Sequence, residues 1–184
     1  VESSSNVAIG AFALHQERHG ADGIVAIGHE ALRYQSRNAA RNTAVGYQAL
    51  INLGNGTNYP GKRNTALGYQ AGGLGAVGGG SEGNGDDNTL IGYQAGVDMT
   101  IGADNVCVGV VAGESITEGE GNVIIGRTAG AAMTTGNENI AIGFEAMGAG
   151  NVVNSSATLG SYNLAMGSKA GYDLTTGQKN VLLG

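Results

Sequence analysis

The sequence predicts an all-β fold, a parallel β-solenoid (β-roll or β-helix) of about ten coils with 17 or 18 residues each. Three observations predict it. An eight-residue motif recurs along the chain. Its glycines are 17 or 18 residues apart, except at three longer gaps. The composition is unsuited to a thick core. Of 184 residues, 35 are Gly, none is Trp and 2 are Phe, so small aliphatic side chains must supply the buried area.

The motif is Asn-x-x-aliphatic-Gly-x-x-Ala. Three nearly identical copies are Asn42-Thr-Ala-Val-Gly46-Tyr-Gln-Ala49, Asn64-Thr-Ala-Leu-Gly68-Tyr-Gln-Ala71 and Asn88-Thr-Leu-Ile-Gly92-Tyr-Gln-Ala95. Looser copies keep the same pattern. The glycines of the motif include Gly10, Gly28, Gly46, Gly68, Gly92, Gly109, Gly126, Gly143 and Gly167, and further motif asparagines are Asn105, Asn122 and Asn139. Because every coil repeats these residue types, each must fill the same structural position in its coil.

The run between Asn and Gly alternates, since the second and fourth residues of the motif are aliphatic or β-branched and the third is usually small. Alternation of this kind indicates a short strand. A second glycine near the middle of the coil, as at Gly102 and Gly119, predicts a second extended run, so we expect two per coil. A helix would place several glycines in each coil, at about 1 kcal/mol each relative to Ala. Asparagines at one corner of successive coils are expected to stack their side-chain amides into a ladder.

The alanine that ends the motif, at Ala49, Ala71 and Ala95 among others, accepts only a methyl group in every testable copy. Such a position indicates that another backbone approaches closely, either across the thin coil or from a neighbouring subunit. The neighbouring subunit is the favoured interpretation, because a coil lined by Ala, Val and Ile buries little area and association would supply the missing stability. A rod of parallel coils most simply assembles around its own axis, so a homotrimer is expected.

The Asn-Thr-Ala-x-Gly-Tyr-Gln-Ala repeat resembles the shaft repeats of phage tail fibres, and it is similar to the Asn-x-x-Ala-x-Gly repeats in the heads of trimeric autotransporter adhesins. The segment Thr158-Leu-Gly160-Ser-Tyr-Asn163-Leu-Ala-Met-Gly167 is most like the latter. The resemblance implies a homotrimeric β-solenoid on a virion tail fibre, or alternatively on a bacterial cell surface. Its implied partners are a host cell-surface glycan or protein receptor and other fibre or tail components.

The whole chain, residues 1–184, is expected to be one repeat domain from a longer fibre. Charge and hydropathy limit its partners. The net charge is -6, and the few basic residues do not form the cluster that a phosphate backbone requires, which excludes nucleic acid. Apolar stretches are too short for a membrane span, so no membrane insertion is expected.

Receptor contact, if any, is expected from three insertions that lengthen the coil, at residues 51–63, 73–87 and 148–162. Loops on a repetitive rod can vary without disturbing the coils. The candidate contact residues within them are Tyr59, Lys62, Arg63, Glu82, Asp86 and Asp87.

No catalytic, cofactor-binding or metal-binding residue is predicted, and no cofactor. His15 and His19 are four residues apart but lack the glutamate directly after the first histidine that a zinc-protease helix requires, so a solvated turn is favoured over a metal shared across a threefold axis. The Gly-rich stretch with Glu82, Asp86 and Asp87 leaves a Ca²⁺ site open.

Two enzyme classes are weaker alternatives. A polysaccharide-degrading tailspike-type enzyme needs two carboxylates at a defined separation, and the sequence indicates no such pair. An acyltransferase with His29 as its base needs a six-residue repeat of aliphatic residues, which the sequence breaks.

Tyr47, Tyr69 and Tyr93 share one motif position and predict a stripe along the rod. The favoured interpretation is that these rings cover a neighbouring strand or subunit, with sugar binding as the alternative. Cys107 occupies a small-residue position and is expected to be buried.

Overall fold

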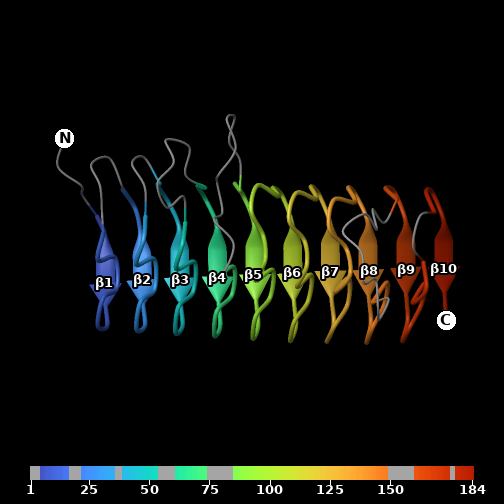
Figure 1. The fold of residues 1–184 in the computed structure, drawn as a ribbon, viewed down its shortest axis with the longest axis horizontal. Coiled ribbons are helices and arrows are strands. Elements are labelled where there is room, and N and C mark those ends of the chain that lie inside the picture. The colour runs from blue at the N-terminus through green and yellow to red at the C-terminus, as the bar shows by residue number, and fades with distance from the viewer. Residues whose placement is uncertain are drawn as a thin grey trace.

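The computed structural model describes residues 5–16, 22–35, 39–53, 61–73, 85–148, 160–174 and 177–184. It is all-β, with ten three-residue strands in one parallel sheet whose spatial order is the chain order. Figure 1 shows the strands side by side along the long axis, with β1 at one end and β10 at the other. The strands are β1 (Val7–Ile9), β2 (Val25–Ile27), β3 (Thr43–Val45), β4 (Thr65–Leu67), β5 (Thr89–Ile91), β6 (Val106–Val108), β7 (Val123–Ile125), β8 (Ile140–Ile142), β9 (Leu164–Met166) and β10 (Val181–Leu183).

The predicted parallel β-solenoid is therefore confirmed. Successive strands pair in perfect motif register, as in Thr43 with Thr65 and Ala44 with Ala66. The longer gaps in the sequence do not shift this register, because β8 and β9 pair in the same way as strands without an insertion between them. Each motif position consequently forms a row that runs along the rod.

The strands bury one face and expose the other. The middle residue of each strand from β2 to β9 points into the coil and is buried, whereas the first and third residues are half-buried or exposed. Since side chains alternate along a strand, the asparagine before each strand also points inward. The small middle residue follows from the thin interior, which most coils fill with Ala.

The expected second strand in each coil is wrong. All ten strands of the described residues belong to one sheet, and the described chain after each strand consists of turns. In the third coil Gly46, Gln48 and Leu50 have φ of 138°, 55° and 48°, so alternate residues adopt left-handed conformations. Repeated reversals of φ curl the chain into successive turns, and these satisfy their polar groups by donating to the neighbouring coil, as from Gln48 N to His29 O.

The motif glycine is required where the strand ends. A Cβ added at Gly46 would overlap the carbonyl of Gly68 in the next coil, and the φ of 138° is one that side chains rarely adopt. Backbones of adjacent coils therefore approach too closely at this corner for any other residue. This explains why the motif tolerates no substitution of the glycine.

The motif alanine contacts its own chain. Ala49, Ala71 and Ala95 are fully buried in a single copy, within a core that also holds Leu32, Leu50 and other aliphatic residues. The favoured interpretation that this alanine meets a neighbouring subunit is thus wrong, and the alternative of close approach across the thin coil is correct.

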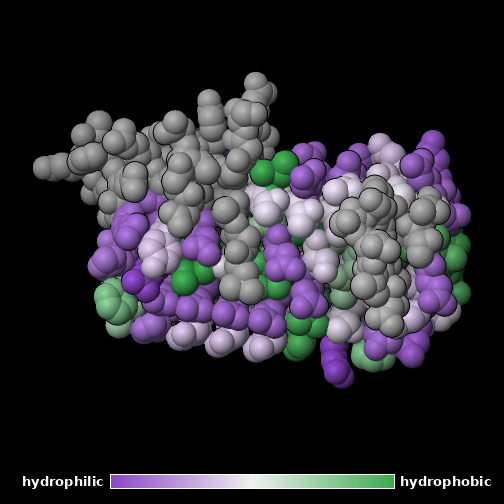
Figure 2. All heavy atoms as spheres, in the orientation of Figure 1, coloured by the Kyte–Doolittle hydropathy of each residue, from purple (hydrophilic) through white to green (hydrophobic). Residues whose placement is uncertain are grey.

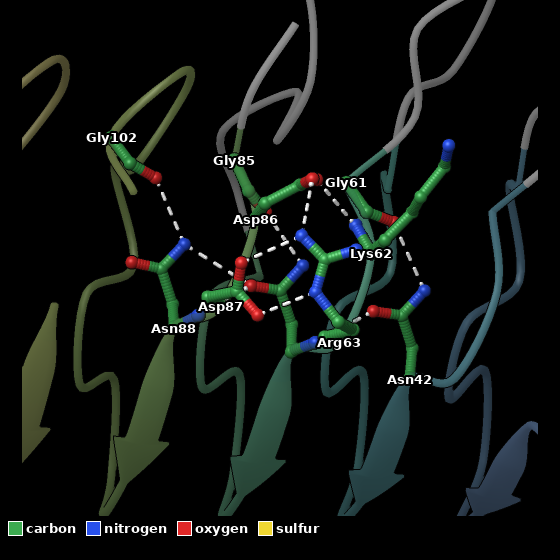
Figure 3. Close-up of polar contacts among 10 residues, drawn as sticks. Asn42, Gly61, Lys62, Arg63, Gly85, Asp86, Asp87, Asn88 and Gly102 are labelled. Atoms are coloured by element: carbon green, nitrogen blue, oxygen red, sulfur yellow. Dashed lines mark hydrogen bonds and ion pairs between the residues drawn. The ribbon is translucent and has the colours of Figure 1, made fainter. Parts of the chain in front are cut away.

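The expected asparagine ladder is confirmed. The backbone N–H of Asn64 donates to Oδ1 of Asn42 at 2.9 Å, and Nδ2 of Asn64 donates to the carbonyl of Gly85 at 2.6 Å. The same pattern continues through Asn88 to Asn180. At the second coil Ile24 replaces the asparagine and is fully buried. The ladder satisfies buried polar groups at the corner where each strand begins (Figure 3).

The described residues contain no apolar helix of membrane-spanning length.

Candidate functional site

The outer strand face runs along all ten strands of the rod. We define it as the first and third residues of β1 to β10. Three of these positions hold Thr, and all the others hold Val, Ile, Leu or Met, so none carries a charge. Leu67 is 46% exposed and Ile125 38% exposed in the single chain. A continuous apolar surface of this kind is typical of a face that another molecule covers.

The sequence contains the signal for this face, because the second and fourth motif residues are aliphatic or β-branched. The sequence-based prediction nevertheless places the subunit contact at the alanine. Alternation alone does not say which set of positions faces inward. The inward set is fixed by the asparagines and glycines, whose rows require contact between coils, and this leaves the larger aliphatic residues outside.

An aromatic row lies just beyond the carboxyl ends of the strands, formed by His29, Tyr47, Tyr69 and Tyr93. Adjacent ring centroids are 5.1 to 5.2 Å apart and adjacent rings are within 8° of parallel. The three tyrosines are 41%, 42% and 47% exposed. Figure 2 shows a row of side chains of intermediate hydropathy along the edge at which the strands end.

The predicted stripe is therefore present and faces outward. The rings cover one another and remain exposed, so they do not cover a strand of their own chain. Stacking occupies both faces of the middle rings, which leaves only their edges and hydroxyl groups for contact with another molecule. This arrangement disfavours recognition that needs an open ring face, such as stacking of a base or a sugar.

An amide row runs beside the aromatic row, formed by Glu30, Gln48, Gln70 and Gln94. Nε2 of Gln70 donates to Oε1 of Gln48 at 2.8 Å, and Nε2 of Gln94 donates to Oε1 of Gln70 at 2.9 Å. The row ends where Nε2 of Gln48 donates to Glu30 at 2.6 Å. This hydrogen bond, together with the nearby Arg33 guanidinium, lowers the pKa of Glu30. The amide row is a polar strip with one carboxylate at its end.

Four of the six predicted receptor-contact residues come together between the coils of β4 and β5 (Figure 3). Arg63 Nε donates to Asp87 Oδ1 at 2.6 Å, and its Nη2 donates to Asp86 Oδ2 at 3.0 Å. The backbone N–H of Lys62 donates to Asp86 Oδ1 at 2.7 Å. The hydrogen bond and charge of Arg63 lower the pKa of Asp87, and those of Asp87 raise the pKa of Arg63.

These contacts join neighbouring coils, so the charged cluster stabilises the rod as well as presenting charge to solvent. Tyr59 and Glu82 lie outside the described residues, as does most of each predicted insertion. Among the described residues, no group of three His, Cys, Asp or Glu side chains could hold a metal ion. The open Ca²⁺ prediction for the Gly-rich stretch involves Glu82 and therefore extends beyond the described part.

Of the three histidines considered as ligands or bases, the structure describes His15 and His29. His15 packs edge-on against Phe12 with centroids 5.3 Å apart, and His19 lies outside the described residues. His29 stacks on Tyr47. Cys107, the middle residue of β6, is buried as expected, and burial raises its pKa to about 12.

Comparison of the chain with protein-family models, curated proteins and solved structures gave no match.

Proposed function

We propose that this protein is a structural and adhesive module of a phage tail fibre, a homotrimeric rod that supports attachment to a host cell-surface glycan or protein receptor. The observation that carries the proposal is the uncharged outer strand face along all ten strands. In the proposed trimer, the three outer strand faces turn toward a common axis parallel to the rod. Association then buries the aliphatic residues that one thin coil cannot cover.

The structural role follows from the repeat. Successive described coils bond to one another through the sheet and the turns, and from Asn42 onward also through the asparagine ladder, which gives a stiff rod. Such a rod suits a shaft that carries binding loops at a distance. The same geometry serves a bacterial trimeric adhesin head, the alternative setting. A polysaccharide-degrading enzyme has no described feature in its favour, and incubation with host polysaccharide should release no reducing sugar.

The oligomeric state tests the proposal first. Light scattering at several concentrations should give three times the chain mass of 18.3 kDa. Ile125→Lys places a charge in the middle of the outer strand face and should shift the protein to monomer, because three ammonium groups would be desolvated near the axis. Glu118→Lys, at an exposed position away from the sheet, is the control and should remain trimeric. A wild-type monomer of full β content would contradict the trimer.

Attachment tests the adhesive role separately. Gly68 and Gly92 are 24 residues apart, so deletion of residues 76–82 restores a coil of 17 residues and keeps Asp86 and Asp87. The variant should remain trimeric and bind less to bacterial cells in a pull-down of labelled protein. Unchanged binding would remove this insertion from the receptor contact, and loss of the trimer would show that it is structural.

A further inference from the structure

We infer that the aromatic row of one copy packs against a second row at the opposite edge of the sheet in the neighbouring copy, coil by coil. This corner row consists of the residues directly before the motif asparagines, or before Ile24 in the second coil, and it includes Gly23, Arg41, Arg63, Asp87, Asp104, Gly121 and Glu138. The inference rests on the proposed trimer and names its subunit contact. It extends the aromatic row to every residue that directly follows a motif glycine, here called the post-glycine row, which continues with Val110, Arg127 and Phe144.

Symmetry brings the two rows together. A residue of the corner row precedes each strand, and a residue of the post-glycine row follows it. The two rows therefore lie along the two opposite sides of the sheet that the strand ends form. When three identical sheets face an axis parallel to the rod, the side of one sheet at which the strands end meets the side of the next sheet at which the strands begin. Rotation about that axis involves no shift along it. Residues of the same coil therefore meet at the same level.

The tyrosine coils fit this contact. In the coils of β3 and β4, Tyr47 and Tyr69 would face Arg41 and Arg63 of the neighbour, and in the coil of β5 Tyr93 would face Asp87. A phenol oxygen accepts from a guanidinium N–H, and a phenol O–H donates to a carboxylate. The three hydroxyls have no partner among the described residues, and the ion pairs of Arg63 use Nε and Nη2 but not Nη1.

The coils of β2 and β7 are complementary in size, and that of β7 also in charge. His29 and Arg127 are large members of the post-glycine row, and each would face a glycine of the corner row, Gly23 or Gly121. The acidic residues Asp104 and Glu138 occupy the coils on either side of Gly121. Arg127 would thus enter a gap between two carboxylates. If each row instead packed against the same row of the neighbouring copy, like charges would face one another.

The exposure of the row agrees with an interface at the rim of the apolar face. The tyrosine rings are stacked and held in place, so little rotamer freedom is lost when a partner covers their edges. Tyrosine and arginine are also the residues most enriched in subunit contacts. The aromatic row directly borders the outer strand face, because only the motif glycine separates Tyr69 from the last residue of β4.

Cysteine cross-linking tests the contact. Arg41→Cys and Tyr47→Cys, combined in a Cys107→Ala background, place thiols at opposite edges of the same coil. Within one chain the two thiols are six residues apart across a strand and cannot approach within the roughly 7 Å that a disulfide requires between Cα atoms. Mild oxidation should therefore yield a covalent trimer on non-reducing electrophoresis. Glu138→Cys with Phe144→Cys offers an independent pair in the coil of β8.

Controls separate this inference from the trimer itself. Arg41→Cys with Tyr93→Cys differs by two coils and should cross-link poorly, and neither single variant should cross-link. A trimer by light scattering in which neither matched pair cross-links would overturn the inference and leave the proposed function standing. Dimers from Tyr47→Cys alone would overturn it in favour of an isologous contact. A wild-type monomer would contradict both proposals.

Discussion

At the scale of the residue, asparagine and glycine carry the fold. The ladder asparagines from Asn42 to Asn163 are buried, and Asn105 uses both its carbonyl and its amide, so that one side chain ties three coils together. The glycine at the end of each strand allows the closest approach between coils. The recurring asparagines and glycines of the motif therefore meet steric and hydrogen-bonding requirements of the fold.

Removal of one ladder side chain should destabilise the rod measurably. Asn105→Ala leaves the carbonyl of Gly119 and the backbone N–H of Asn122 without their partners, and Nδ2 of Asn122 keeps only its bond to Gly136. Because unsatisfied buried polar groups cost about 1–3 kcal/mol each, the free energy of unfolding should fall by roughly 2–4 kcal/mol. Denaturant unfolding at fixed protein concentration measures it. Ile24→Asn, which adds a ladder residue where the sequence lacks one, is the contrasting variant, and a change below about 0.5 kcal/mol for Asn105→Ala would contradict the prediction.

At the scale of the element, the unit is one short strand followed by turns. A three-residue strand is too short to be stable alone, and it persists because nine equivalent pairings extend across the sheet. The rows on its surface differ in character, since the outer strand face is apolar, the aromatic row is stacked and the amide row is hydrogen-bonded. One periodic backbone thus presents three distinct strips.

The amide row should make stability depend on pH. Since the folded state lowers the pKa of Glu30, its carboxylate stabilises the fold above the ordinary glutamate value of 4.5, and that contribution is lost as the pH falls through the lowered pKa. The melting temperature of the wild type should therefore drop more between pH 5 and pH 3 than that of Glu30→Gln. Glu118→Gln is the control. Equal acid sensitivity of wild type and Glu30→Gln would contradict the assignment.

At the scale of the whole molecule, the rod is a stack in which each coil contacts its neighbours. The figures agree with a quasi-one-dimensional architecture, and the in-register pairing continues across every insertion (Figure 1). In such a stack stability is approximately the sum of coil and interface contributions. Length and the position of the loops can then change without changing the fold.

Deletion of one complete coil should preserve the fold. Removal of residues 106–122 joins Asn105 to Val123 and keeps the ladder and the strand register. The shortened chain should retain its β circular dichroism and form a rod about 5 Å shorter by small-angle X-ray scattering. Removal of residues 106–113 alone deletes β6 and its glycine but leaves the rest of the coil, and should prevent cooperative folding. Loss of structure in the full-coil deletion would contradict independent stacking of coils.

The sequence by itself determined the solenoid, the coil length, the asparagine ladder and the alignment of the tyrosines in one row. Each follows from a local rule repeated many times, so the signal accumulates along the chain. It also brought forward Lys62, Arg63, Asp86 and Asp87, although their cross-coil pairing depends on which coils are adjacent. The repeat does not determine the backbone conformation between one strand and the next, and the prediction of a second strand in that part of the coil was wrong.

Only the tertiary structure decided which face is inside. The sequence shows two aliphatic or β-branched positions and one usually small position in each strand, and either set could line a core. The fold buries the middle strand residue together with Ala49 and its equivalents, which places the first and third strand residues outside. The apolar surface of the rod, on which the proposed trimer depends, follows from that choice of inward residues.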